Sequence, residues 1–412
     1  MRILMVSPEY PPMPGGIGRY AANLTKELQK SGLEVYIVCD MRGNGDFYGI
    51  SPTNTYTSEV LLQVVDELKP DIVHVQFDPG LYGLRFDPKH PKKVCSYIDN
   101  FYYKCNTPIV TTFHSGHASL RQWINPSALL KSYGRIGKIG TPIRAILRFW
   151  KYYLNYQAFN TNIIKDKIRR SRTCIVFSEY MSKNLSRSRI SRSEVIYHGS
   201  EPAIYPQPSK KEARSKFSIP VNDDQLLALA FGFSTAAKGW DILNKLDIPT
   251  GWKLVVNSSF KSYYNKEEEQ SIAVNLKKAT NNNQIIDLHR GYLTEQDLST
   301  LFYACDVILL PYKSATGSGI MFDALAHGLP FIATDLEFFK EFTIQGLGIT
   351  VKRHPHEFSR GLRILSSNYI KYKQAVNMFK AKLKWDSIAK QHYRIYNNVI
   401  HHNTRRTSSN SN

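Results

Sequence analysis

The chain has 412 residues, of which 42% are hydrophobic, and its 54 Lys and Arg outnumber 34 Asp and Glu to give a formal charge of +20. This length predicts two soluble globular domains of about 150–200 residues, each able to bury its own core. No stretch approaches the roughly 18–20 apolar residues of a spanning helix, and the start lacks the apolar run of a signal peptide. The positive charge indicates an anionic partner: nucleic acid, an anionic membrane surface or a phosphorylated substrate. The five cysteines are scattered without metal-binding spacing, which suits a reducing cytoplasm.

Short apolar strands alternate with helical patterns along both halves of the chain. In the first half we expect strands at Arg2–Ser7, Val35–Cys39, Ile72–Gln76, Ile109–Phe113, Cys174–Ser178 and Val195–His198, with the first helix at about residues 19–31. In the second half we expect strands at Leu226–Phe233, Trp252–Asn257, Ile285–Leu288, Val307–Leu310 and Phe331–Ala333. Strands that alternate with helices predict parallel, doubly wound sheets covered on both faces.

The segment from Tyr205 to Arg214 is rich in proline and charge, and we interpret it as the linker between the two domains. The first domain would then span residues 1–204. Two such domains facing each other would leave a cleft at the carboxyl ends of both sheets, where ligands usually bind. The polar residues 401–412 are expected to form a disordered tail.

A basic insertion is predicted at residues 131–172, which contain eleven Lys or Arg and one acid, Asp166. One helical face there carries apolar residues flanked by cations: Ile143, Leu147, Trp150 and Leu154 beside Arg144, Arg148 and Lys151. This pattern resembles a helix that lies in a membrane interface, with its cations toward anionic lipid. The alternative is a core-facing helix whose basic side is solvated. Nucleic-acid binding is not expected, because no recognised module or presented row of aromatics is found.

Near the N-terminus, Gly16, Gly18 and Ala21 match the spacing G-x-G-x-x-A, and Asp40 ends the next predicted strand. This pattern is a dinucleotide-binding fingerprint and makes an NAD(P)-dependent oxidoreductase an alternative function. In that fingerprint, however, the first glycine directly follows the strand. Here a long Pro-rich loop separates Ser7 from Gly16. The match is therefore interpreted as accidental, and a surface loop without a ligand is a further alternative.

The segment Pro311–Pro330 follows an apolar strand, and its Gly317-Ser318-Gly319 turn opens a helix that ends at Gly328. Free backbone N–H groups at a helix start bind phosphate well. A turn that merely connects a strand to a helix is the alternative interpretation.

The amino-acid sequence of this segment resembles part of the C-terminal half of retaining family 4 glycosyltransferases, which have the GT-B fold and use nucleotide-sugar donors. Further segments match the family in the same order over about 390 residues: Gly15-Gly16, Asp71–Gln76, Thr111–His114, Val176–Glu179, Val195–Gly199, Phe231–Asp241, His289–Tyr292 and Trp385–Ala389. The resemblance implies two Rossmann-like domains facing across a cleft. The second would span residues 205–385, and a helix at residues 386–400 would cross back to the first domain.

The resemblance also implies roles for individual residues. His114 would face the reacting sugar and Lys238 would grip the diphosphate, so these two are the candidate catalytic residues. The donor diphosphate is expected at Gly15, Gly16, Lys238, Thr316, Gly317, Ser318 and Gly319, and the nucleoside at Arg290, Gly291, Tyr292 and Asp323. Outside the family context, His114 would be interpreted as a structural histidine. His117 and His198 are weaker candidates.

The sequence departs from the family at two positions. The first of two family glutamates, which contacts the donor sugar, is replaced by Ala315, and the second is Asp323, which can still reach a ribose. Phe233 stands where the family carries an arginine of a cation pair. Lys313, Arg19 or Arg290 are hypothesised to compensate for it.

The sequence thus predicts a retaining glycosyltransferase that moves a sugar from a nucleotide sugar to a saccharide acceptor. The acceptor is expected to be lipid-linked, as in lipopolysaccharide-like surface glycans, and the enzyme peripheral at the inner face of the cell membrane. No cofactor, metal or nucleic acid is expected. The departures at Ala315 and Phe233 leave a second alternative, a non-catalytic protein that binds a membrane or another polyanion.

Overall fold

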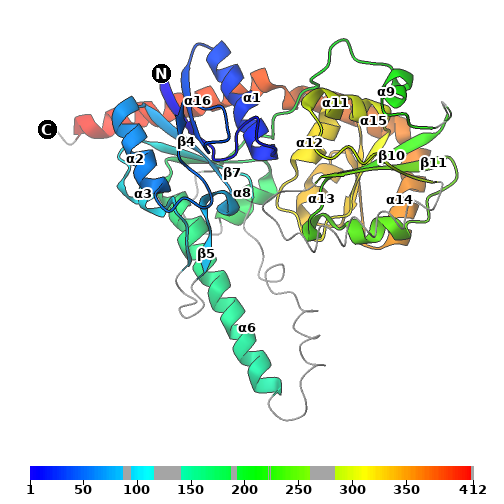
Figure 1. Cartoon of the computed structure of the whole chain (residues 1–412), viewed down its shortest axis with the longest axis horizontal. Coiled ribbons are helices and arrows are strands. Elements are labelled where there is room, and N and C mark those ends of the chain that lie inside the picture. The colour runs from blue at the N-terminus through cyan, green and yellow to red at the C-terminus, as the bar shows by residue number, and fades with distance from the viewer. Residues whose placement is uncertain are drawn as a thin grey trace. The chain divides into compact units, whose positions relative to one another are not determined.

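The computed structural model describes residues 1–86, 94–115, 141–186, 193–220, 222, 224–259 and 284–409 (Figure 1). The chain divides into two compact units. The first contains Met1–Ile196 and Ala389–Asn412, and the second contains Tyr197–Ile388. Each unit is built on one parallel sheet with helices packed against it, so the predicted doubly wound α/β class is confirmed.

The sheet of the first unit has seven strands in the order β3-β2-β1-β4-β7-β8-β9. These strands are β1 (Arg2–Val6), β2 (Glu34–Cys39), β3 (Phe47–Tyr48), β4 (Ile72–Phe77), β7 (Ile109–Phe113), β8 (Thr173–Val176) and β9 (Ser193–Val195). The helical elements are α1 (Gly16–Lys30), α2 (Thr57–Leu68), η1 (Pro79–Tyr82), α3 (Asp99–Lys104), α6 (Thr141–Ala158), η2 (Phe159–Lys165), α7 (Asp166–Arg170) and α8 (Glu179–Ser186). A short hairpin pairs β5 (Arg85–Phe86) with β6 (Val94–Cys95). All six residues of β4 are buried, as expected for a strand covered on both faces.

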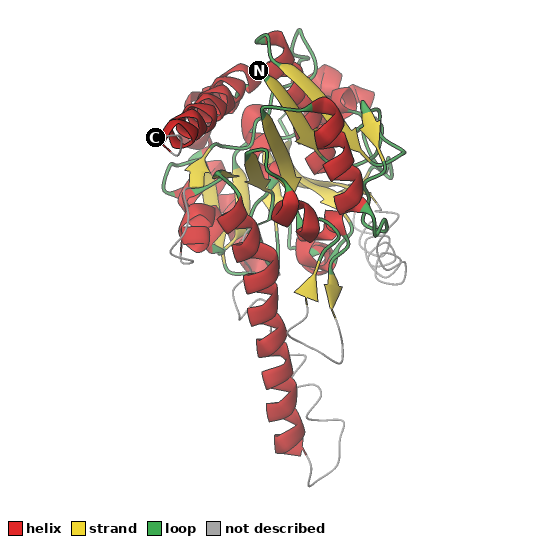
Figure 2. Ribbon diagram, turned by 90° about the vertical axis from the view of Figure 1, so that its left-hand side faces the viewer, coloured by secondary structure: helices red, strands yellow, loops and turns green. Residues whose placement is uncertain are grey.

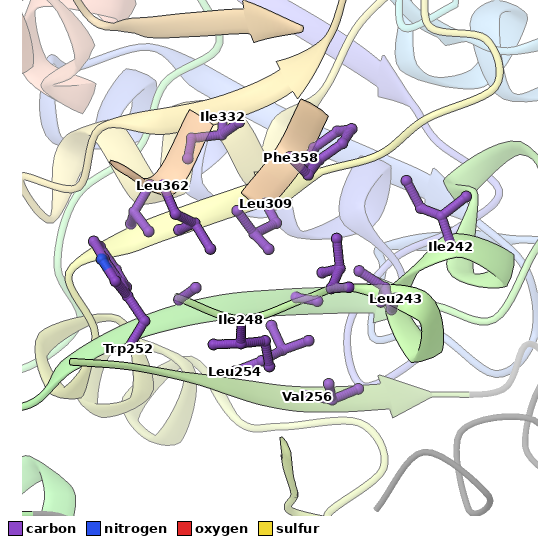
Figure 3. Close-up of a cluster of buried hydrophobic side chains, with 14 of the residues drawn as sticks. Ile242, Leu243, Ile248, Trp252, Leu254, Val256, Leu309, Ile332, Phe358 and Leu362 are labelled. Carbon is purple, nitrogen blue, oxygen red and sulfur yellow. The ribbon is translucent and has the colours of Figure 1, made fainter. Parts of the chain in front are cut away.

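The sheet of the second unit has six strands in the order β12-β11-β10-β13-β14-β15. These strands are β10 (Leu226–Phe233), β11 (Trp252–Ser259), β12 (Ile285–Asp287), β13 (Val307–Leu310), β14 (Phe331–Thr334) and β15 (Gly348–Val351). The helical elements are α9 (Lys210–Lys216), η3 (Ala236–Lys238), η4 (Trp240–Lys245), α11 (Glu295–Ala304), α12 (Gly319–Ala326), α13 (Glu337–Thr343), α14 (Pro355–Ser367), α15 (Tyr369–Phe379) and η5 (Lys380–Leu383). One face of this sheet packs under α14, with Leu254, Leu309 and Ile332 against Phe358 and Leu362 in a single buried cluster (Figure 3).

The chain enters the second unit at Tyr197, a few residues before the predicted domain boundary at residues 204 and 205. The Tyr197 ring packs against Phe322, Phe342 and Phe379 of that unit. The segment predicted as a linker, Tyr205–Arg214, lies within the second unit. Its second half begins α9, where Ser209 and Glu212 form a capping box. Apolar contacts and helix capping therefore tie these segments to the second unit.

The last helix, α16 (Trp385–Ser409), begins in the second unit and continues in the first from Ala389. The helix extends beyond residue 400 to Ser409, and disorder of residues 401–412 remains a prediction. The buried Ile395, Tyr396 and Val399 give the helix an apolar face on the first unit.

Helix α6 extends away from the rest of the first unit (Figure 2). Its continuation is anchored, because Phe159, Ile163 and Ile164 of η2 are buried. The Lys167 ammonium, which is fully buried, forms an ion pair with Asp99. Residues 116–140, which include His117 and the start of the predicted basic insertion, lie outside the described residues.

Candidate active site

His114 lies at the carboxyl end of β7, directly after Phe113. Its ring Nε2 is 2.8 Å from the side-chain Oε1 of Gln76, near the end of the neighbouring strand β4. The rings of Tyr20 and Phe177 approach His114 edge-on, each with its centroid 5.1 Å away. The expected histidine therefore stands at the strand ends where a ligand of a parallel sheet binds, held by neighbours from several elements.

Behind His114 lies a buried polar network that reaches the last helix. His74 of β4 is fully buried, and its Nδ1 and Nε2 lie 2.7 Å from the Tyr396 hydroxyl and from the Thr112 Oγ1, respectively. The side-chain nitrogen of Gln76 lies 3.3 Å from His74 Nε2. Burial, together with the nearby His392 and His114, holds the pKa of His74 well below its usual value. His74 is therefore a neutral hydrogen-bonding group at neutral pH.

The start of α1, where the donor diphosphate was expected, receives a carboxylate of the chain itself. Glu9 Oε1 accepts hydrogen bonds from the backbone N–H groups of Ile17, at 3.0 Å, and of Gly18, at 3.2 Å. A Cβ atom on Gly15 would overlap this carboxylate, so glycine is required there by packing against Glu9. Gly15 and Gly16 remain predicted diphosphate ligands, but this geometry argues against them, since Glu9 would repel an anion.

The same geometry argues against the dinucleotide interpretation of this loop. Residues 7–15 separate the end of β1 from the start of α1. A dinucleotide fingerprint requires a tight turn and a free helix start for the pyrophosphate. The loop has neither feature.

In the second unit, Lys238 is the last residue of η3, and its side chain reaches the start of α12. Its Nζ donates a 2.5 Å hydrogen bond to the Tyr312 hydroxyl and lies 4.0 Å from the centre of that ring. The Tyr312 hydroxyl is 3.2 Å from Ser318 Oγ, which caps α12 by accepting from the N–H of Met321. The structure thus brings together the predicted Lys238, Ser318 and Gly319, with a cation beside a helix N-terminus. This combination suits a phosphate group.

A glycine allows the Lys238 loop to lie against the segment after β13. Gly239 has a φ of +72°, and a Cβ there would lie 1.8 Å from the Pro311 carbonyl oxygen. Asp241, just beyond it, pairs with Arg353 at 2.5 Å and with Lys313 at 3.3 Å. Burial would raise the pKa of Asp241, but these two cations hold it below its usual value. Lys313, hypothesised to replace the missing arginine, is thus paired with a carboxylate of the chain.

Two further predicted residues lie in or against α12, to which Asp323 belongs. Asp323 accepts a 2.6 Å hydrogen bond from Ser200 Oγ and is buried. His198 stacks on Phe322 with ring centroids 5.9 Å apart, and its Nε2 would lie 3.2 Å from a Cβ on Gly319. His198 therefore belongs with the second unit, against the start of α12, and not with the first unit as the sequence suggested.

Asn257, a fully buried residue of β11, forms hydrogen bonds with the turn predicted to bind the nucleoside, at Arg290 and Gly291. Its side-chain amide accepts from the N–H of Arg290 at 3.0 Å and donates to the carbonyl of Gly291 at 2.9 Å. Next to this turn, the rings of Phe233 and Tyr292 stack with centroids 6.1 Å apart. Phe233, which replaces the family arginine, therefore belongs to an aromatic pair. Its partner Tyr292 is 49% exposed.

Glu9, Gln76, Asn257 and Tyr312 were missed by the sequence analysis. Gln76 and Asn257 are polar residues near the ends of otherwise apolar strands, which is a readable signal, since parallel strand ends meet at one edge. Glu9 and Tyr312 carry no such signal, because loop geometry brings them to their partners. The roles expected for Thr316 and Gly317 remain predictions.

One protein family matches the first half of the chain. The family model of Glycosyltransferase Family 4 matches residues 14–203. These residues are therefore similar to that family, and the match covers somewhat less than half of the chain. No curated protein sequence matches the chain.

Solved structures of similar fold cover nearly the whole chain. Sucrose-phosphate synthase from Thermosynechococcus elongatus has a TM-score of 0.67 at 14% identity, covering 97% of this chain and 98% of that one. HepE of Anabaena, solved in complex with UDP, has a TM-score of 0.62 at 12% identity, covering 97% and 100%. WaaG, a glycosyltransferase involved in lipopolysaccharide biosynthesis, has a TM-score of 0.59 at 13% identity, covering 96% and 99%. At these identities the likeness shows the fold, which is GT-B.

The family match and the fold together identify the chain as a glycosyltransferase of the GT-B type. The expected fold class and the expected family resemblance are confirmed. Among the described residues, no helix combines the length and the hydropathy that crossing a membrane requires.

Proposed function

We propose that this glycosyltransferase takes its sugar from a nucleoside diphosphate sugar. The Lys238–Tyr312–Ser318 cluster at the start of α12 is the observation that carries the proposal. A leaving nucleoside diphosphate gains negative charge during transfer, and an ammonium group beside oriented N–H dipoles stabilises that charge. HepE was solved with UDP and with UDP-glucose, which supports a diphosphate donor here as well.

The donor base and the diphosphate contact are tested together by calorimetric titration with UDP, GDP, ADP and NAD(H). We expect one nucleoside diphosphate to bind, and Lys238→Ala to weaken it about 10- to 150-fold, since a charge-assisted hydrogen bond contributes about 1.5–3 kcal/mol. Lys245→Ala, which removes an exposed cation seven residues further on, is the control and should bind as the wild type does. Unchanged affinity in Lys238→Ala would refute the diphosphate assignment, and binding of NAD(H) alone would refute the donor class.

We further propose that transfer retains the configuration of the anomeric carbon, with His114 beside the reacting sugar. His114 stands at the strand ends, where the parallel sheet opens to ligands. The anomeric configuration of the first product, read by proton NMR, tests retention. Binding of the nucleotide sugar without any transfer would favour the alternative of a non-catalytic binder.

For the acceptor, we propose a saccharide carried on a lipid, used in a surface-glycan pathway at the inner face of the cell membrane. Helix α6 supports this location. Leu147 and Trp150 are 63% and 52% exposed, and Phe149 and Tyr152 beside them are also exposed. The alternative that this helix faces a core does not fit these side chains. Exposed apolar and aromatic groups beside cations such as Lys151 are typical of a helix that lies in an anionic interface.

Vesicle sedimentation tests the membrane proposal. We expect binding to phosphatidylcholine vesicles only when phosphatidylglycerol is included, and weaker binding as salt screens the charges. The double variant Leu147→Glu/Trp150→Glu should lose binding. Ile344→Glu, at an apolar residue that is 87% exposed in the second unit, should keep it. Equal binding to neutral vesicles, or binding that ignores salt, would count against the proposal.

A further inference from the structure

Gln76 connects the His114 ring to the interior of the first unit. Its side-chain amide lies within hydrogen-bond distance of His114, His74 and Met5. It is fully buried near the end of β4, where it pairs in register with Thr112 of β7. Because it stands between two histidines, the direction in which its amide points determines how each of them is protonated.

The contact with Met5 decides the orientation of the amide. The Gln76 side-chain nitrogen lies 3.1 Å from Met5 Sδ, and a thioether sulfur can only accept a hydrogen bond. The NH₂ group therefore faces Met5 and His74, and the carbonyl oxygen faces His114. Because that oxygen can only accept, His114 Nε2 must carry the proton in the 2.8 Å hydrogen bond.

The remaining bonds then run in one direction. Gln76 and the Thr112 hydroxyl, at 3.3 and 2.7 Å, both donate to His74 Nε2, and His74 donates from Nδ1 to the Tyr396 hydroxyl on α16. Gln76 and His74 each donate one of these hydrogen bonds and accept another, so the bonds reinforce one another in a low-dielectric interior. The Tyr20 and Phe177 rings at 5.1 Å restrict the His114 ring from its sides.

We infer that Gln76 is a positioning residue for His114: it places a proton on Nε2, so that in the neutral form of the ring the lone pair is on Nδ1. A sugar hydroxyl near His114 would then meet a ring of defined tautomer and orientation, which saves the cost of ordering it during reaction. The link to catalysis rests on the proposed role of His114, whereas the tautomer does not.

The tautomer is measured directly by nitrogen NMR of the protein labelled with [15N]histidine, with the His114 signal assigned from its loss in His114→Gln. We expect the Nε2–H form in the wild type. Gln76→Met, which has a similar shape but no acceptor oxygen, should lose this preference. Gln76→Glu, which keeps an oxygen at the same place, should retain it. A His114 signal that stays Nε2–H in folded Gln76→Met would overturn the inference.

Kinetics separate positioning from packing. We expect Gln76→Met to lower kcat at least tenfold with little change in the KM of the donor, and Gln76→Glu to recover most of that loss. Gln345→Met in the second unit, where the amide donates to the Glu341 carbonyl, is the matched control and should act as the wild type does. Full kcat in folded Gln76→Met would also overturn the inference.

Two outcomes keep the test decisive. If Gln76→Met does not fold, Gln76→Glu decides, because loss of the Nε2–H form in that variant would contradict an acceptor role. If the tautomer changes as expected but the wild type transfers no sugar from any donor, the proposed function fails while the assignment of Gln76 stands.

Discussion

The Nδ1 atom of His74 lies 2.7 Å from the hydroxyl of Tyr396, although 322 residues separate them in the sequence. Both side chains are fully buried. This hydrogen bond joins the last helix to the middle of the first sheet, in the layer directly behind His114. The return of α16 to the first unit is therefore more than an apolar contact, because it completes the polar network that orients the candidate active-site histidine.

Removing the Tyr396 hydroxyl should destabilise the protein. In Tyr396→Phe, a buried histidine nitrogen loses its partner, at a cost of about 1–3 kcal/mol in the free energy of unfolding. Urea unfolding of the wild type and the variant measures the difference. Tyr393→Phe, on the same helix but 44% exposed, should change stability little. If the two variants lose equal free energy of unfolding, the buried hydrogen bond stabilises the protein no more than an exposed hydroxyl does.

Stability should fall in mild acid because of His74. Its pKa is lowered in the folded state, mainly by burial, so the unfolded chain binds this proton more readily. The contribution to stability is therefore complete above the usual pKa of about 6.5 and is lost as pH falls below it, by up to about 1.4 kcal/mol per pH unit. Unfolding measured from pH 8 to pH 5 tests this slope. His74→Gln should flatten the slope, whereas the exposed His356→Gln should not.

Gly239→Ala should be more damaging than another glycine substitution at positive φ. Gly251 has a φ of +85° with nothing within 4 Å of the place where a Cβ would lie, so alanine there meets only backbone strain of about 1–2 kcal/mol. At Gly239 the Cβ would also overlap the Pro311 carbonyl, for a total of about 2–5 kcal/mol. Thermal or urea unfolding compares the two. Similar losses would mean that the loop shifts freely away from Pro311.

Glu9 provides a test of whether the donor diphosphate approaches α1. Glu9→Gln keeps an acceptor for the N–H groups of Ile17 and Gly18 but removes the negative charge. If the diphosphate lies near Gly15 and Gly16, the variant should bind the nucleoside diphosphate several-fold more tightly. We expect no such change, because the carboxylate already occupies the helix start. Calorimetric titration decides between the two, and Glu34→Gln, at a half-exposed carboxylate of the same unit, is the control.

Local patterns in the sequence were sufficient for most of the fold. Runs such as those of β4 and β13 are apolar throughout because both faces of a parallel strand are covered, and this requirement is visible residue by residue. β3 was not predicted because it has only two residues, and β15 was not predicted because it begins with a glycine and its two middle residues are only partly buried. The division of the chain at Tyr197 could not be predicted from local patterns, because Tyr197 contacts rings that are distant in the sequence.

In the candidate site too, some features could be predicted from the sequence and others depend on tertiary packing. The sequence by itself predicted the fold class, and its helix start at Ser318 indicated a phosphate site for a local physical reason. His114 and Lys238 were predicted only through the resemblance to a family. Only the tertiary structure decided which groups surround them. The carboxylate of Glu9 at α1, the hydroxyl of Tyr312 beside Lys238, and the amide of Gln76 against His114 are contacts set by chain packing. Such contacts leave no periodic trace in the sequence, because a hydrogen bond depends on where two atoms lie in space and not on their spacing along the chain.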